Sequence, residues 1–264
     1  IETIKKYGMG FAPNSWSALK SYMLSEGFTE EELEQGSLIS RSQKNTRNTF
    51  DFFVNRAMFP FIDLAGHIVG FGGRALTPDD KRKYLNSKDT LVYSKNRFLF
   101  SMNFAKNAAV KDKTILLCEG NLDVISLNQA GFENAVASCG TSLTAEHIKL
   151  LSRYTASRKI YLSFDTDSAG QKATSRNAEL IKEAFTGLGN IKQFDESYIS
   201  TSEDKYSCEI RVISPPEGKD PDEFIRSVGA ESYREYMQHA PLLLDYQLNN
   251  ICLLYTSDAA DDKA

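Results

Sequence analysis

Cysteine, histidine and tryptophan are scarce in this chain of 264 residues, which holds four, three and one of them. The four cysteines (Cys118, Cys139, Cys208 and Cys252) are far apart and form no CxxC pair. This spacing indicates neither a zinc site nor a disulfide framework, and it fits a reducing compartment. No apolar run approaches the roughly 18 residues that a membrane-spanning helix needs. We therefore expect no zinc site and no membrane among the partners of this chain.

The charge of the chain is unevenly distributed. The net charge of −4 comes from 31 basic and 35 acidic residues. Residues 41–113 hold 14 Lys or Arg and 6 Asp or Glu, a net of +8, which leaves the remainder at −12. This asymmetry suits a protein that binds a polyanion on one surface and cations on another. A solvated basic surface without a ligand is the alternative interpretation.

The first part of the chain shows a mixture of helical and strand patterns. Apolar spacing predicts a helix over Asn14–Glu26, and Thr29 begins a capping box for a second, short helix. The apolar stretches Met58–Asp63 and His67–Gly72 predict a β-hairpin. From Arg74 to Arg97 the pattern is weak.

After Lys113 the chain alternates between strand and helix patterns. Strands are predicted at Thr114–Cys118, Ala135–Ser138, Ile160–Phe164 and Ile210–Ile213, and helices at Leu122–Ala130, from near Thr144, and at 168–185, Asp222–Ser227 and Ser232–His239. Such alternation predicts an α/β fold with a parallel sheet flanked by helices. Gly187–Cys208 is polar and aperiodic, as expected of an insertion.

Acidic side chains follow the ends of the predicted strands. They are Glu119 and Asp123 after the first strand, Asp165 and Asp167 after the third, and Asp220 and Asp222 after the fourth. The carboxyl ends of parallel strands meet at one edge of a sheet, where ligands bind. Carboxylates there need compensation for their lost hydration, and Mg²⁺ takes such oxygen ligands. The pattern favours a site for a divalent metal ion.

Helix capping is the structural alternative for each acidic cluster taken alone. Asp167 could cap a helix that starts at Ser168, and Glu119 could favour a helix dipole. Asp220 before Pro221 is ordinary chemistry for a helix start. Capping does not explain why acidic clusters recur at successive strand ends, so we favour the cation site.

The acidic motifs resemble those of a known family. Glu119-Gly120 with Asp165-x-Asp167 resembles the TOPRIM signature of primases, topoisomerases and some nucleases. An ordered series of further motifs, from about Tyr7 to Tyr246, resembles the RNA-polymerase core of bacterial DnaG-type primases: Arg56–Pro60, Gly70–Arg74, Lys83–Ser87, Cys118–Val124, Ala137–Thr141, Phe164–Gly170 and Glu217–Glu223.

The resemblance implies specific roles for individual residues. Glu119, Asp165 and Asp167 would be catalytic and bind Mg²⁺ or Mn²⁺, with Asp123, Asp220 and Asp222 as supporting acids or further metal ligands. Nucleic acid or nucleotide phosphates would be held by Arg56, Arg74, Lys83, Tyr84, Asn86, Lys95 and Arg97. Two departures stand out: Asn121-Leu122 replaces the usual Tyr-Met, and Thr166 and Ser168 replace Gly and Arg.

The resemblance also implies an activity and an organisation. The expected function is DNA-directed synthesis of short RNA primers on single-stranded DNA from ribonucleoside triphosphates, with an RNA–DNA hybrid as product. The chain would be a monomeric, cytoplasmic bacterial fragment that meets the replicative helicase only through a domain absent here. We expect a basic N-terminal α/β subdomain at 1–112, a TOPRIM subdomain at 113–214, a small C-terminal helical subdomain at 215–251, and a disordered or non-native tail at 252–264.

Three other activities remain as alternatives. A TOPRIM nuclease or topoisomerase would break phosphodiesters instead of forming them. A strand-end Asp-x-Asp is also similar to aspartyl-phosphate phosphatases, in which Asp165 would be the nucleophile. The non-enzymatic alternative is a nucleic-acid-binding fragment without a productive metal site.

Overall fold

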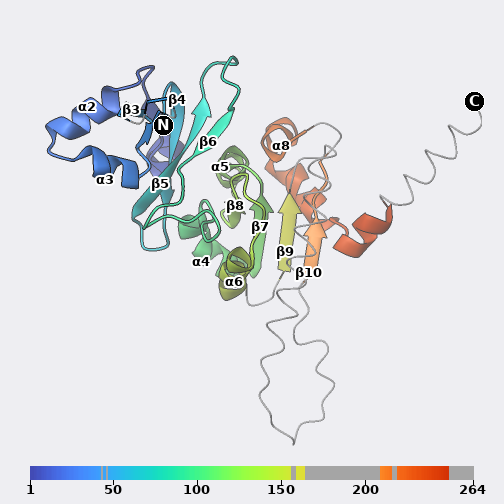
Figure 1. The fold of residues 1–264 in the computed structure, drawn as a ribbon. Helices are drawn as coiled ribbons and strands as arrows, with labels where there is room; N and C mark the ends of the chain where they lie inside the picture. Colours follow the sequence, from blue (N-terminus) through green and yellow to red (C-terminus); the bar gives the residue numbers. More distant parts are fainter. Residues whose placement is uncertain (43, 46, 156–158, 164–208, 216–218, 250–264) are drawn as a thin grey trace, which may run out of the picture. The chain divides into compact units, whose positions relative to one another are not determined.

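The computed structural model describes residues 1–42, 44–45, 47–155, 159–163, 209–215 and 219–249. The chain divides into two compact units, Ile1–Phe98 and Leu99–Ala264 (Figure 1). The border after Phe98 lies earlier than the expected border after residue 112, because helix α4 (Met102–Asp112) belongs to the second unit. No helix in the described ranges is long and apolar enough to cross a membrane.

The first unit is built on a four-stranded sheet. Its strands β1 (Gly10–Ala12), β4 (Arg56–Ile62), β5 (Ile68–Ala75) and β6 (Tyr84–Asn86) lie in the order β1-β4-β5-β6, and every pair is antiparallel. The predicted hairpin is confirmed as β4 and β5. Its turn is closed by Asp63, whose carboxylate accepts the N–H groups of Ala65 and His67, both at 2.9 Å.

Short helices and a two-stranded ribbon complete the first unit. These elements are α1 (Glu2–Tyr7), α2 (Ala18–Ser25), α3 (Glu30–Gln35), β2 (Ile39–Arg41) and β3 (Thr49–Asp51). The capping box at Thr29 is confirmed, with Glu32 as its partner. Helix α2 begins at Ala18, later than predicted, because the buried Asp51 accepts the N–H groups of Leu19 and Lys20 at 2.8 and 2.9 Å. That cap comes from a distant strand.

The second unit contains the predicted parallel sheet. Strands β7 (Thr114–Cys118), β8 (Ala135–Ala137), β9 (Lys159–Ser163) and β10 (Glu209–Val212) lie in the order β10-β9-β7-β8, with parallel pairing throughout. The central strand β7 is apolar and fully buried from Ile115 to Cys118. Burial on both faces accounts for its continuous hydrophobic run, which is typical of parallel sheets.

Helices pack against this sheet in two groups. Helix α4 contacts α6 (Ala145–Tyr154), β7 and β8, whereas α5 (Asn121–Gln129) contacts α8 (Pro221–Gln238) as well as β7 and β8. The two C-terminal helices that the sequence predicts form one element with a break at Gly229, whose φ of 79° is left-handed. Helix α8 packs on α5 within the second unit.

Some elements differ from the sequence-based expectations. Strand β6, the β2–β3 ribbon and helix α4 were not predicted. The helix expected at 168–185, the insertion at 187–208 and the tail at 252–264 lie outside the residues that the structure describes.

Candidate functional site

Glu119 follows the central strand β7 at the carboxyl edge of the parallel sheet. It is half-buried and stands directly before Gly120 and helix α5. Asp123 is 7% exposed, and its Oδ2 accepts the Gly120 N–H at 3.0 Å. A Cβ at position 120 would lie 2.9 Å from that oxygen, so glycine is needed for the carboxylate to approach this closely. Glu119 and Asp123 thus flank the junction of β7 and α5 at one strand end, and their predicted roles stay predictions.

The end of β9 lies beside the end of β7. Cys118 is in register with Ser163 on one side and with Ala137 on the other. Asp165 and Asp167 follow Ser163 by two and four positions in the sequence, but they lie outside the described residues. Their predicted roles therefore stay predictions.

Helix α8 brings a third carboxylate to α5. The Asp222 N–H donates to Asp123 Oδ1 at 3.3 Å, and the Asp222 carboxylate accepts a hydrogen bond from Ser126 Oγ. Arg226 Nε lies 2.8 Å from Asp222 Oδ1. Asp123 and Asp222 are thus neighbours although 99 residues separate them in the sequence, which no local pattern indicated.

Asp220 has the placement that capping chemistry predicts. It is the N-cap of α8, and its Oδ1 accepts the Glu223 N–H at 2.7 Å. Within the described part of the chain, no three His, Cys, Asp or Glu side chains form a group that could hold a metal ion.

Two buried hydroxyls connect α8 to the end of β9. Ser163 Oγ and Tyr233 Oη lie 2.8 Å apart, and both residues are fully buried. Burial raises the pKa of Tyr233 well above its usual value, so this hydroxyl stays protonated. The hydrogen bond thus ties Ser163, the last residue of β9, to Tyr233 in the C-terminal half of α8.

Replacing Tyr233 with phenylalanine tests this connection. We expect Tyr233→Phe to lower the free energy of unfolding by about 1–2 kcal/mol, because Ser163 loses its buried partner. Urea unfolding curves of both proteins measure the difference. Tyr236→Phe is the matched control on the same helix, since Tyr236 is 43% exposed. Equal stability of the two variants would contradict the expected role of the hydroxyl.

Arg56 is a correction to the predicted phosphate-binding set. Its side chain is 2% exposed. Nη1 donates to the carbonyl oxygens of Gly73 at 3.2 Å and Arg82 at 2.9 Å, while Nη2 pairs with Asp80. Burial lowers the pKa of the guanidinium, and the Asp80 carboxylate opposes that shift. These partners hold Arg56 inside the first unit, where a phosphate cannot reach it.

Arg74, Lys83 and Tyr84 form a basic and aromatic patch on β5 and β6. Arg74 is in register with Tyr84 and donates from Nη1 to its hydroxyl at 3.1 Å. The Arg74 guanidinium lies 5.5 Å from the centre of the Tyr84 ring, and Lys83 Nζ lies 5.9 Å from it. Tyr84 is 41% exposed. Asn86, two residues along β6, shares the strand face of Tyr84. The structure thus brings four predicted residues together.

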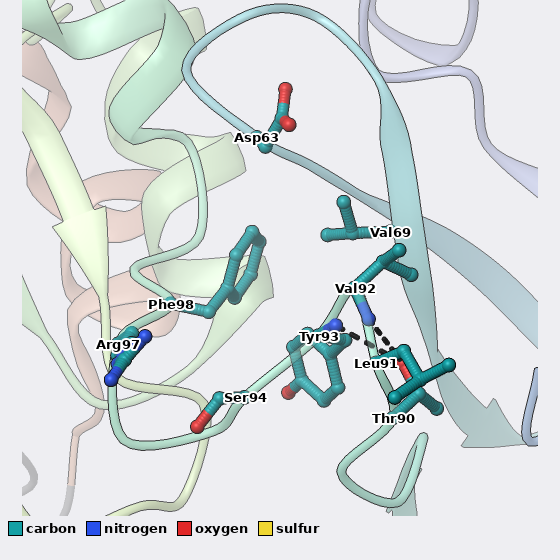
Figure 2. A pocket seen from close by; sticks show the side chains of 9 residues that line it. All are labelled: Asp63, Val69, Thr90, Leu91, Val92, Tyr93, Ser94, Arg97 and Phe98. Carbon is teal, nitrogen blue, oxygen red and sulfur yellow. Dashed lines mark hydrogen bonds between the residues drawn. The ribbon is translucent and has the colours of Figure 1, made fainter.

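Lys95 and Arg97 lie in the segment that lines a pocket of the first unit. The pocket has a volume of ≈ 300 Å³ and is lined by Asp63, Val69, Thr90, Leu91, Val92, Tyr93, Ser94, Arg97 and Phe98 (Figure 2). Two of the lining rings, Phe98 and Tyr93, belong to an aromatic cluster, with centres 4.8 and 5.4 Å from that of Phe61. Sequence reasoning missed this pocket, although the apolar run Leu91-Val92-Tyr93 in a polar segment was a signal.

Known proteins of one family match this chain. The DNA primase catalytic core N-terminal domain model matches residues 1–106, and a Toprim-like model matches residues 116–193. A DNA primase of Clostridium acetobutylicum is 40% identical over 94% of this chain and 37% of the relative. One of Synechococcus elongatus is 36% identical over 98% of this chain and 35% of the relative. The chain thus spans little more than a third of these relatives.

Solved structures agree with the sequence comparisons. A DNA primase domain from Pseudomonas aeruginosa superposes with a TM-score of 0.80 at 32% identity, covering 96% of this chain and 72% of that one. A DnaG primase catalytic domain bound to single-stranded DNA has a TM-score of 0.74 at 30% identity, with 95% and 71% covered. On these matches, the chain belongs to the family of DnaG-type primase catalytic cores with a Toprim domain.

Proposed function

We propose that this chain synthesises short RNA primers on single-stranded DNA from ribonucleoside triphosphates. The observation that carries the proposal is the placement of Glu119 and Asp123 at the carboxyl edge of the Toprim sheet, in a member of the primase core family. The reaction joins a 3′-hydroxyl oxygen to an α-phosphorus and expels pyrophosphate. It requires no nucleophile from the protein.

The carboxylates at this edge have the chemistry that a divalent cation with hard oxygen ligands needs, but the described residues alone do not form a complete metal site. Glu119, Asp123 and Asp222 supply carboxylate oxygens, which Mg²⁺ and Mn²⁺ prefer. Glu119 and Asp123, together with Asp165 and Asp167, would hold the ion, and Asp220 and Asp222 would support them. When bound, such an ion supplies positive charge for the reacting phosphate.

The other residues of the proposal position the substrates. Arg74 and Lys83 offer positive charge to phosphates at a solvent-exposed patch, and the exposed Tyr84 ring can stack on a base. Lys95 and Arg97 add basic charge along the segment 90–98 of the same unit. The related domain bound to single-stranded DNA supports a single-stranded template.

Removing charge from the patch tests its role in template binding. Each lysine or arginine that neutralises a phosphate of single-stranded DNA contributes ~0.7 to the slope of log K against log salt. We expect the double variant Arg74→Ala/Lys83→Ala to lower the magnitude of that slope by ~1.4. Fluorescence anisotropy with a labelled oligonucleotide at several salt concentrations measures it.

Lys149→Ala is the matched control for the patch, since Lys149 is an exposed lysine of helix α6 in the other unit. We expect this control to keep the wild-type slope. A double variant with the wild-type slope would show that the patch does not contact the template.

Primer synthesis itself tests the proposed function. The chain is incubated with single-stranded DNA, labelled ribonucleotides and Mg²⁺ or Mn²⁺, and short RNA is scored on a sequencing gel. We expect products that require the template and the metal and that a chelator abolishes. Cleavage of the DNA without RNA synthesis would favour the nuclease alternative. DNA binding without metal binding would favour the non-catalytic one.

A further inference from the structure

Ser126 links helix α5 to helix α8 through the carboxylate of Asp222. Ser126 is 7% exposed, and its hydroxyl donates a hydrogen bond to Asp222 Oδ1. Arg226 lies one helical turn after Asp222, with its Nε 2.8 Å from the same oxygen. The Asp222 side chain is 15% exposed. It therefore receives a hydrogen bond from one helix and a positive charge from the other.

The N–H group of Asp222 continues these contacts to Asp123. Asp222 is the second residue of α8, and an N–H at this position has no acceptor within its own helix. It donates to Asp123 Oδ1 at 3.3 Å, while Asp123 Oδ2 accepts the Gly120 N–H at 3.0 Å. Both oxygens of Asp123 are thus held by N–H groups at the start of a helix. The position of one oxygen depends on how α8 packs against α5.

The spacing of these residues produces two contacts between the helices. Asp123 and Ser126 are three positions apart in α5, so they share one face of that helix. Asp222 bonds to both of them, through its N–H to Asp123 and through its carboxylate to Ser126. One contact would leave α8 free to rotate about it, whereas two contacts restrict that rotation. The Asp123 carboxylate is thereby held beside Gly120, the residue that follows Glu119.

An ordinary surface ion pair is the alternative interpretation of the Arg226 contact. Arg226 is 68% exposed, and exposed pairs contribute little to stability. Arg234 and Glu231 form such a pair on the same helix, with Nη1 and Oε1 2.6 Å apart. The pair of Arg226 differs, because its acceptor is mostly buried and also binds Ser126. Residues that share one partner are energetically coupled, so Arg226 acts on the contact between the helices.

We propose that Ser126 and Arg226 are positioning residues, which hold Asp222 and through it Asp123 at the carboxyl edge of the Toprim sheet. The inference rests on the proposed function, because it assigns both residues to the same reaction. It gives Asp222 a role that requires no contact with a substrate. The Asp222 N–H orients Asp123, and the Asp222 carboxylate is held by the two helices.

Primer synthesis by the intact chain tests the proposal. We expect Ser126→Ala to lower kcat about 10-fold or more, because removing a group that orients a functional side chain usually costs that much activity. The KM for ribonucleotides and the affinity for the template should not change. Arg226→Ala should lower kcat less, since Ser126 still holds Asp222. Arg226→Lys should restore wild-type kcat, because it keeps the charge at the same spacing.

Hydrogen exchange separates positioning from a general loss of stability. In Ser126→Ala, the N–H groups of Gly120 and Asp222 should exchange faster, because the Asp123 carboxylate that accepts both is held less firmly. The N–H groups of strand β7 should keep their wild-type rates. A merely structural role would increase exchange in β7 as well, since the whole unit would open more often.

Ser227→Ala and Arg234→Ala are the matched controls on α8. Ser227 is exposed, and its hydroxyl donates within its own helix, to the Phe224 carbonyl at 2.9 Å. Both controls should keep the wild-type kcat and the wild-type exchange at Gly120.

Two results would overturn this inference alone: a wild-type kcat in Ser126→Ala, or wild-type exchange of its Gly120 N–H. A wild type that makes no primers would overturn the proposed function, and the exchange rates would still decide whether Ser126 holds Asp123. If Ser126→Ala does not fold, an unchanged kcat in Arg226→Ala overturns the inference.

Discussion

Glu119→Gln is expected to reduce primer synthesis about 10³-fold or more. The substitution keeps the size of the side chain and removes its charge from the carboxyl edge of the Toprim sheet. Under the proposed function the reaction transfers a nucleotidyl group from a highly charged triphosphate. Losing a carboxylate that would hold the metal ion would then destabilise the transition state directly. Primer synthesis at saturating ribonucleotide and Mg²⁺ measures the effect, and circular dichroism checks the fold.

Glu133→Gln is the matched control for Glu119→Gln. Glu133 is exposed in the turn before β8, so its charge can be removed from the same unit away from the sheet edge. The control should retain wild-type synthesis. Should Glu119→Gln retain near-normal synthesis as well, Glu119 would have no role in holding the metal ion.

The parallel sheet could be predicted from the sequence because its strands are continuous apolar runs. Strand β7 is buried on both faces, and its predicted bounds, Thr114–Cys118, are those of the structure. Strand β6 gave no such signal. It is three residues long and half exposed, and it depends on pairing with β5. Helix α4 was missed for a related reason, since small residues such as Ala105 and Ala109 form much of its buried face.

The candidate site could be predicted in part. Acidic residues at strand ends are visible in the sequence, and the sheet edge that gathers Glu119 and Asp123 follows from the alternation of strands and helices. The contact between Asp123 and Asp222 could not be predicted, because it depends on how α8 packs on α5.

Arg56 shows why a basic residue in a motif is weak support for phosphate binding. The sequence places it at the start of an apolar run in a segment of net positive charge. Its acceptors are the Gly73 and Arg82 carbonyls and the Asp80 carboxylate, all at least 17 residues away in the sequence. A Cβ at Gly73 would lie 2.9 Å from the Arg56 Cδ, closer than a van der Waals contact. The glycine at position 73 therefore leaves the space that the Arg56 side chain occupies.

Arg56→Ala is therefore expected to destabilise the protein while leaving template binding intact. Removing one member of a buried ion pair costs about 3–5 kcal/mol. We expect a loss of about 3 kcal/mol in the free energy of unfolding, at the lower end of that range, because Asp80 is 31% exposed and can be hydrated. Urea unfolding measures the loss. The folded variant should bind single-stranded DNA with the wild-type affinity and salt dependence, and a lowered salt slope would return Arg56 to the phosphate-binding set.

The pH dependence of the free energy of unfolding measures the contribution of Asp80, the partner of Arg56. The Arg82 N–H, and then the charge of Arg56, hold the pKa of Asp80 below its usual 3.8. A carboxyl group whose pKa is lower in the folded state stabilises the fold above its unfolded pKa, and that contribution is lost as the pH falls through the folded value. The stability difference between wild type and Asp80→Asn should therefore be constant above about pH 5 and shrink below pH 4.

In an Arg56→Ala background the same difference should be smaller, because the cation that lowers the pKa of Asp80 is gone. An unchanged difference would mean that the Arg82 N–H alone sets the pKa, and that the buried guanidinium stabilises the sheet through its carbonyl acceptors.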